Sequence, residues 1–278
     1  MTSTILITGA SSGIGKATAG LFHERGWNVV ATMREPEREA DLRGLDNVLV
    51  TRLDVTDTRS IQAAVAAAID RFERIDVLLN NAGYGAYGPL EATPSETIRR
   101  QFDTNVIGLL EVTKALLPHF RANRAGTIVN ISSIGGRMAF PLGSLYHGTK
   151  WAVEGLSEAL TFELDAIGAR MKIVEPGLIA TDFGGRSLEL SADESIDEYD
   201  GMLDALFAGM SPDARRYYPP TVVAEVIYQA ATDGTDRLRY AGDEDARAII
   251  AQREATDGET FLSGIKAQFG LVPADNAT

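Results

Sequence analysis

The chain has 278 residues, of which 45% are hydrophobic and 23% charged, a composition typical of a globular protein with a buried core. Its formal net charge of -13 argues against a protein that binds nucleic acid by neutralising phosphates. The chain has no cysteine, which excludes disulfides, thiolate catalysis and cysteine-ligated zinc. Its three histidines are too far apart for an HExxH-like pair, so we expect no metal site.

Short apolar runs alternate along the chain with longer segments of helical period. We expect strands at residues 4–7, 28–32, 48–53, 75–79, 127–131 and 172–174. We expect helices at residues 15–25, 35–43, 60–72, 93–117 and 145–164. The helix from Thr93 is predicted to open with a capping box, Thr93 to Glu96, and to end before Pro118.

The pattern changes after Pro176. Residues 184–212 form a long insertion with an amphipathic piece, which we interpret as a candidate active-site lid. A helix from Pro219-Pro220, a short strand at 238–241 and a C-terminal helical stretch are expected to follow.

The predicted strands are apolar throughout, which is typical of parallel strands covered on both faces. Their alternation with helices predicts an α/β fold, a doubly wound parallel sheet of about seven strands. No linker or repeat divides the sequence, so we expect one domain over residues 1–278. The N-terminus does not resemble a signal peptide, and no run of about 18 apolar residues could span a bilayer. We therefore expect a cytoplasmic protein without a membrane partner.

A glycine-rich turn, residues 8–15, follows the first predicted strand and opens a helix. Its spacing, Gly-x-x-x-Gly-x-Gly, lets the backbone approach a pyrophosphate, which the helix N-terminus attracts. Within a first strand-helix-strand unit this turn indicates a dinucleotide site. At the end of the second strand, the acid of NAD-selective folds is missing and Arg34 stands beside its position, where an arginine suits a ribose 2′-phosphate. The sequence therefore favours NADP(H) over NAD(H).

Tyr146 and Lys150 lie four residues apart at the start of a long predicted helix, so they share one face. An ammonium beside a tyrosine favours the phenolate and suits proton transfer. Ser133 follows the fifth strand, whose carboxyl end faces the same crevice as the nucleotide. Ser132 is the alternative for this hydroxyl.

These residues resemble the short-chain dehydrogenase/reductase family over residues 4 to 181. The matching positions are Thr8-Gly9-x-x-x-Gly13-x-Gly15, Asp54-Val55, Asn80-Asn81-Ala82-Gly83, Asn105, Ser133, Tyr146-x-x-x-Lys150, and Pro176-Gly177 with Thr181. The nearer likeness is to the branch with 17β-hydroxysteroid and retinol dehydrogenases and bacterial oxidoreductases of unassigned substrate. The resemblance implies a Rossmann-type fold and an enzyme that interconverts a carbonyl and an alcohol.

The resemblance also implies roles for single residues. Tyr146 is the acid or base, Lys150 holds the nicotinamide ribose and lowers the Tyr146 pKa, Ser133 polarises the carbonyl, and Asn105 holds a water in a proton relay. The cofactor-binding residues implied or predicted are Gly9, Ser11, Ser12, Gly13, Ile14, Gly15, Arg34, Asp54, Val55, Asn81, Ala82, Gly83, Tyr146, Lys150, Pro176, Gly177, Ile179 and Thr181. The segment 81–83 has an equally weighted alternative role, which is to stabilise the central sheet.

The substrate is expected to be a hydrophobic small molecule. The apolar residues expected to line its site or to pack the lid are Met138, Phe140, Phe183, Leu203 and Phe207. Trp151 and the helix face around Val153 and Leu160 suggest a homodimer or homotetramer. Two alternatives stay open, a 3-oxoacyl thioester reductase and a non-catalytic dinucleotide sensor.

The acidic charge lies mainly in the last third of the chain. Residues 1–181 carry 18 basic and 20 acidic side chains, whereas residues 182–278 carry 8 and 19. We expect these acids to form mainly solvated surface, which makes a strongly anionic substrate unfavourable.

Overall fold

A computed structural model describes residues 2–181, 187–193, 195–209, 211 and 215–271, without the side chain of residue 207. Within these ranges, seven strands form one parallel sheet in the order β3-β2-β1-β4-β6-β7-β9. The strands are β1 (Thr4–Ile7), β2 (Asn28–Met33), β3 (Val48–Arg52), β4 (Val77–Asn80), β6 (Thr127–Ile131), β7 (Arg170–Glu175) and β9 (Arg239–Ala241). The prediction of a doubly wound parallel sheet is confirmed.

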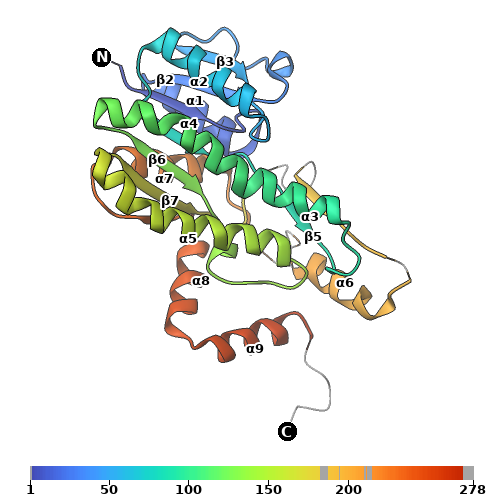
Figure 1. Ribbon diagram of the computed structural model, residues 1–278. Helices are drawn as coiled ribbons and strands as arrows, with labels where there is room; N and C mark the ends of the chain where they lie inside the picture. The colour runs from blue at the N-terminus through green and yellow to red at the C-terminus, as the bar shows by residue number, and fades with distance from the viewer. Residues whose placement is uncertain (1, 182–186, 194, 210, 212–214, 272–278) are drawn as a thin grey trace.

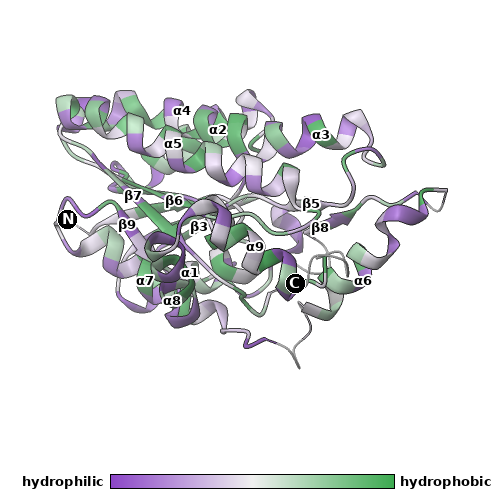
Figure 2. Ribbon diagram, turned by 90° about the horizontal axis from the view of Figure 1, so that it is seen from below, coloured by the Kyte–Doolittle hydropathy of each residue, from purple (hydrophilic) through white to green (hydrophobic). Residues whose placement is uncertain are grey.

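Helices cover both faces of this sheet (Figures 1 and 2). One face carries α2 (Thr58–Phe72), α4 (Gly108–Asn123) and α5 (Ser144–Ile167), and the other carries α1 (Gly13–Glu24) and α7 (Pro220–Thr232). The chain ends in α8 (Glu244–Ala255) and α9 (Gly258–Gln268), which extend away from the sheet in Figure 1. In the described ranges, we find no helix with both the length and the apolar character needed to cross a membrane.

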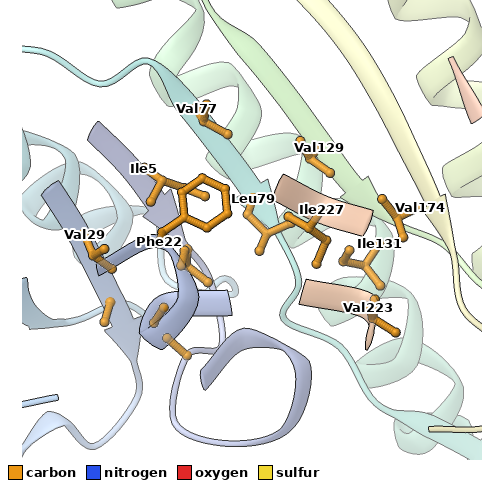
Figure 3. Packing of buried hydrophobic residues seen from close by; sticks show 14 of the residues in the cluster. Ile5, Phe22, Val29, Val77, Leu79, Val129, Ile131, Val174, Val223 and Ile227 are labelled. Atoms are coloured by element: carbon orange, nitrogen blue, oxygen red, sulfur yellow. The ribbon is translucent and has the colours of Figure 1, made fainter. Parts of the chain in front are cut away.

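The core beneath α1 and α7 is made of aliphatic side chains from the central strands (Figure 3). Phe22 of α1 and Ile227 of α7 are fully buried against strand residues such as Ile5 and Leu79. Burying each such side chain contributes roughly 1.5–3 kcal/mol. This packing explains why the strands carry no solvent-facing polar alternation.

Residues 35–43 were expected to be helical, and this prediction is wrong. Only Pro36–Arg38 forms a short 3-10 turn. The buried Glu39 carboxylate accepts hydrogen bonds from the backbone N–H groups of Asp41 and Leu42, at 2.9 and 3.0 Å. A side chain that captures backbone donors in this way replaces the helical hydrogen bonds.

The expected helix over residues 93–117 is divided differently. It consists of α3 (Ser95–Phe102), a π-helical turn (Asp103–Ile107) and α4. The capping box does not form, because the Thr93 hydroxyl donates to the Pro89 carbonyl instead. Pro118 lies inside α4 on an exposed side, and the fully buried Phe120 beyond it holds the last turn against the core.

A second, two-stranded parallel sheet was not predicted. It pairs β5 (Gly85–Tyr87) with β8 (Leu188–Leu190), about a hundred residues apart in sequence. Both strands are too short to stand out as apolar runs, so only tertiary pairing identifies them. Beyond β8, α6 (Asp200–Gly209) forms the amphipathic piece expected in residues 184–212.

Lys172 is a fully buried cation in β7. Its ammonium donates to the Thr235 and Arg237 carbonyls, to the Tyr240 hydroxyl at 3.1 Å and to the Asp233 carboxylate at 3.4 Å. Burial tends to raise the pKa of Asp233, but hydrogen bonds from Tyr240 and Thr235 and the Lys172 charge lower it to about 2. One side chain therefore ties β7 to the turn between α7 and β9.

We expect Lys172→Met to destabilise the fold by roughly 3–5 kcal/mol, because it leaves buried acceptors without a donor. Urea denaturation would measure this change. Arg170→Met in the same strand is the control, because its ion pair with Asp236 is exposed and contributes about 0–1 kcal/mol. Equal midpoints for the two variants would contradict the anchoring role of Lys172.

Candidate active site

The predicted site residues follow four neighbouring strands of the sheet. The glycine turn follows β1, residues 81–83 follow β4, Ser133 follows β6 and residues 176–181 follow β7. Because parallel strands end at the same edge of a sheet, these segments come together at the carboxyl edge.

The glycine turn is built so closely that side chains would not fit. Gly9 and Gly13 have φ values of 68° and 55°, in the left-handed region. A Cβ on Gly15 would lie 2.3 Å from the Gly9 carbonyl oxygen. A Cβ on Gly13 would meet the Thr181 side chain at 3.1 Å, so the turn also lies against the segment after β7.

Helix α1 begins within this turn with its N-terminal backbone donors available. Ser12 occupies the N-cap position, but its side chain makes no capping hydrogen bond with the described residues. Ser11 is exposed, whereas Ile14 packs on the core. The uncapped N–H groups and the helix dipole form a cradle for an anion such as a pyrophosphate.

Asn81 fastens the glycine turn to β4. Its amide Nδ2 donates to the carbonyls of Thr8 and Gly9, at 2.9 and 3.0 Å. In return, the Thr8 hydroxyl accepts from the backbone N–H of Asn81 and Ala82, at 3.0 Å each. These contacts of Asn81 and Ala82 join β1 to β4, as the alternative role in stabilising the central sheet requires.

Arg34 is exposed at the carboxyl end of β2, and we find no hydrogen bond or ion pair from it to the described residues. Arg38 instead forms an ion pair with Glu35. Beyond β3, Asp54 accepts hydrogen bonds from Thr56 and Val55 packs under Gly108 of α4. Unlike Arg38, Arg34 can therefore bind a ligand at the carboxyl edge of the sheet without losing an ion pair with the described residues.

Ser133, Tyr146 and Lys150 come together as predicted. The Lys150 ammonium is buried, donates to the Ile131 carbonyl at 2.8 Å and lies 5.7 Å from the centre of the Tyr146 ring. The Ser133 hydroxyl accepts from the Gly135 N–H at 3.0 Å and hydrogen-bonds the Tyr146 phenol. Ser132 turns toward Gly136 instead, which identifies Ser133 as the hydroxyl of this group.

Burial shifts the proton affinities of both titratable groups. It lowers the pKa of Lys150 to about 8, and the charge of Glu154 acts against this shift. It raises the pKa of Tyr146, and the hydrogen bond with Ser133 acts against that shift. The expected lowering of the Tyr146 pKa is therefore not found in the chain alone, because burial of the ring penalises the phenolate.

Asn105 lies in the π-helical turn between α3 and α4, an irregularity that often marks functional positions. Its amide Nδ2 donates to the Tyr84 carbonyl at 2.8 Å and the Thr149 hydroxyl at 3.1 Å, and its Oδ1 accepts from the Tyr84 N–H at 3.1 Å. Asn105 thereby ties the segment after β4 to α5, directly beside Lys150.

The segment after β7 is held by contacts with Asp243 and Tyr218, among others. The Gly177 N–H donates to Asp243 at 2.8 Å, and Ile179 forms a parallel bridge with Tyr218. Asp243 is also the N-cap of α8, where it accepts from the Ala246 N–H. Asp243 was not predicted as a residue of this region, although an acid followed by Glu244 and Asp245 is a recognisable helix start.

An apolar wall lies against Tyr146. It comes from β5, the loop before α5, β8, α6 and α9, and consists of Tyr87, Phe140, Leu142, Leu188, Leu206, Ile265 and Phe269. Met138 is buried but is not part of this wall, and Leu203 lies near Pro89 and Tyr199. Phe183 and the side chain of Phe207 lie outside the described residues. The contribution of α9 was not predicted.

Known proteins similar to this chain are oxidoreductases. The family model described as short chain dehydrogenase matches residues 3–190. An uncharacterised oxidoreductase of Schizosaccharomyces pombe is 50% identical over 239 residues, covering 86% of this chain and all of the relative. The 3-ketodihydrosphingosine reductase of Bacteroides thetaiotaomicron is 40% identical over 203 residues, covering 73% of this chain and 74% of the relative.

Solved structures are similar over nearly the whole chain. A short-chain dehydrogenase from Streptomyces avermitilis has a TM-score of 0.84 and 32% identity, over 98% of both chains. A short-chain dehydrogenase from Burkholderia cenocepacia in complex with NADP has a TM-score of 0.75 and 25% identity, also over 98% of both chains.

We expect Gly15→Ala to weaken binding of a nicotinamide dinucleotide at least about tenfold, because its Cβ would force the turn open against the Gly9 carbonyl. Gly20→Ala is the matched control, since its Cβ would meet nothing within 4 Å and the change stabilises helix α1 by about 1 kcal/mol. Titration of the dinucleotide by calorimetry checks both, and unchanged affinity in the Gly15 variant would contradict the cradle.

Proposed function

The chain belongs to the short-chain dehydrogenase/reductase family, and from this premise we propose that it uses NADP(H) to interconvert a hydrophobic ketone or aldehyde and the corresponding alcohol. The observation that carries the proposal is the meeting of Ser133, Tyr146 and Lys150 at the edge that also holds the glycine cradle. The same meeting favours an enzyme over a dinucleotide sensor, because a sensor has no use for a buried proton-transfer group.

In this proposal the bound nicotinamide supplies or accepts the hydride, and the chain's own residues orient the reactants and move the proton. Tyr146 donates its phenolic proton to the carbonyl oxygen during reduction and takes it back during oxidation. The Ser133 hydroxyl accepts from the Gly135 N–H, and its own hydrogen, which points to the Pro176 carbonyl at 3.5 Å, turns to the substrate oxygen in this proposal. Lys150 holds the ribose hydroxyls and favours the phenolate, while Asn105 positions the segment beside it.

The remaining expected contacts form the cofactor site of the proposal. Gly9 through Gly15 hold the pyrophosphate, Asp54 and Val55 the adenine, residues 81–83 the nucleotide, and residues 176–181 the nicotinamide. The fit is supported by the close glycine turn and by the start of helix α1, where no side chain of the described residues caps the N-terminal N–H groups. Arg34 holds the 2′-phosphate, since it is exposed and without another ion pair in the described chain.

A hydrophobic substrate is supported by the apolar wall against Tyr146. Arg137 does not serve an anionic substrate, because it is already paired with Glu175 at 2.8 Å and Glu254 at 2.6 Å. The similar 3-ketodihydrosphingosine reductase is named as a reductase of a 3-keto compound, which agrees with a carbonyl substrate. Helix α9 and the expected lid segment 184–212, of which residues 184–186, 194, 210 and 212 lie outside the described residues, are the proposed cover of this substrate.

For a homo-oligomer, the exposed aromatic residues of α5 provide the proposed contact. Trp151 is 50% and Phe162 77% exposed, which is unusual for such large apolar side chains. Val153 cannot take part as expected, because it is buried within its own chain.

We expect Tyr146→Phe to reduce turnover by roughly 10²- to 10⁴-fold, because it removes the proton donor but keeps the ring. NADPH affinity should stay within about twofold. A panel of steroids, retinoids, aliphatic ketones and sugars identifies the assay substrate. Tyr228→Phe, which changes a tyrosine packed on Phe22 far from the site, is the control. Normal turnover by the Tyr146 variant would refute the assignment.

We expect Arg34→Ala to weaken NADPH binding by roughly 10- to 100-fold, since a charge-assisted contact with a phosphate is lost. NADH binding should stay the same, because it has no 2′-phosphate. Arg38→Ala removes a neighbouring arginine that is already paired with Glu35 and should change neither affinity. Fluorescence titration with both dinucleotides checks this, and equal losses for NADPH and NADH would argue against the assignment of Arg34.

A further inference from the structure

His147 directly follows Tyr146, the proposed proton donor, in the sequence. Its ring does not contribute to the proposed proton transfer but forms two hydrogen bonds with the loop before α5. The side chain is buried, with only 4% of the residue exposed. Its Nδ1 lies 3.1 Å from the Gly135 carbonyl oxygen, and its Nε2 accepts from the Phe140 N–H, also at 3.1 Å. Both ring nitrogens are thus used by one loop, residues 134–143, which leads from Ser133 to α5.

These two contacts determine the protonation state of the ring. Because Nε2 accepts a hydrogen bond from the Phe140 N–H and the Gly135 carbonyl can only accept one, the imidazole is neutral and carries its hydrogen on Nδ1. Burial favours the same form and lowers the pKa of His147 to about 4. At neutral pH, His147 therefore donates to one end of the loop and accepts from the other.

The loop is shaped to receive this ring. A Cβ on Gly135 would lie 2.5 Å from Nδ1, and a Cβ on Gly143 would lie 2.5 Å from Nε2. The rings of Tyr87, Phe140 and Tyr146 surround it, with centres 5.6 to 6.0 Å away. The imidazole fills a slot between two glycines, and no larger side chain fits on either side.

The two hydrogen bonds lead to different parts of the site. The Gly135 carbonyl accepts from His147, and the Gly135 N–H donates to the Ser133 hydroxyl. The Phe140 N–H donates to His147, and the Phe140 side chain is part of the apolar wall. One contact therefore orients the hydroxyl proposed to polarise the carbonyl, and the other orients a side chain proposed to meet the substrate.

We propose that His147 is a positioning residue that sets the Ser133 hydroxyl through Gly135 and the substrate-facing wall through Phe140, so that the helix carrying Tyr146 also aligns its two partners. The role rests on the proposed function for its kinetic consequence, but not for its structural one. In this proposal, the Nδ1 contact affects the rate of the chemical step, and the Nε2 contact affects substrate binding.

Three substitutions separate the contacts. His147→Asn keeps a donor near the Nδ1 position, His147→Gln keeps an acceptor near the Nε2 position, and His147→Phe keeps the ring but removes both. We expect the Asn variant to raise KM and largely keep kcat, the Gln variant to lower kcat and largely keep KM, and the Phe variant to do both. Each lost contact should change its own constant by about 2- to 10-fold.

His119→Phe is the matched control, because His119 also accepts a backbone hydrogen bond, from Ile75 at 3.1 Å, but lies away from the site. It should leave kcat and KM unchanged. A second readout, amide hydrogen exchange in residues 134–141 of the free protein, needs no turnover. Exchange at Phe140 should quicken in the Asn and Phe variants, and exchange at Gly135 in the Gln and Phe variants.

Unchanged exchange in the loop would overturn the inference, whatever the activity. Equal changes of kcat and KM in the Asn and Gln variants would also overturn it, since they would indicate only a general loss of packing. If the parent protein reduces no carbonyl in the panel while the exchange pattern appears, the proposed function fails and the structural role of His147 stands.

Discussion

The exchange of hydrogen bonds between Thr8 and Asn81 is the contact on which the carboxyl edge of the sheet depends. The Asn81 amide holds the Thr8 and Gly9 carbonyls, and the Thr8 hydroxyl holds the backbone after β4. With the two central strands joined in this way, Gly15 can approach the Gly9 carbonyl so closely that helix α1 starts at the sheet edge. The start of helix α1 lies against this joint, and the chain leads directly from it to Tyr84, which Asn105 binds.

Two buried lysines differ in how many of their donors the described chain uses. Lys172 is enclosed by two carbonyls, a hydroxyl and the carboxylate of Asp233, which use its donors for holding β7 to β9. Lys150 donates to one carbonyl, that of Ile131, and burial brings its pKa to about 8. A cation with donors to spare, beside a buried tyrosine, is able to bind a ligand and bias a proton.

The acidic residues of the last third of the chain were expected to form mainly solvated surface. Several of them instead make structural contacts. Asp243 is buried, caps α8 and holds Gly177 beside the site. Asp233 pairs with Lys172, and Glu254 pairs with Arg137. These acids attach the C-terminal elements to the part of the chain that carries the glycine turn.

The sequence alone determined the strands of the central sheet, the glycine turn and the spacing of Ser133, Tyr146 and Lys150, because apolar runs, backbone freedom and helical period are local properties. Two local predictions were wrong. The buried Glu39 carboxylate prevents a helix at residues 35–43, and the packing of Phe120 continues helix α4 beyond Pro118. Only the tertiary structure decided the pairing of β5 with β8, the contribution of α9 to the apolar wall and the grip of His147 on residues 135–140. Each of these depends on contacts between segments distant in sequence or on the orientation of a buried side chain. A local sequence pattern predicts neither of these two properties.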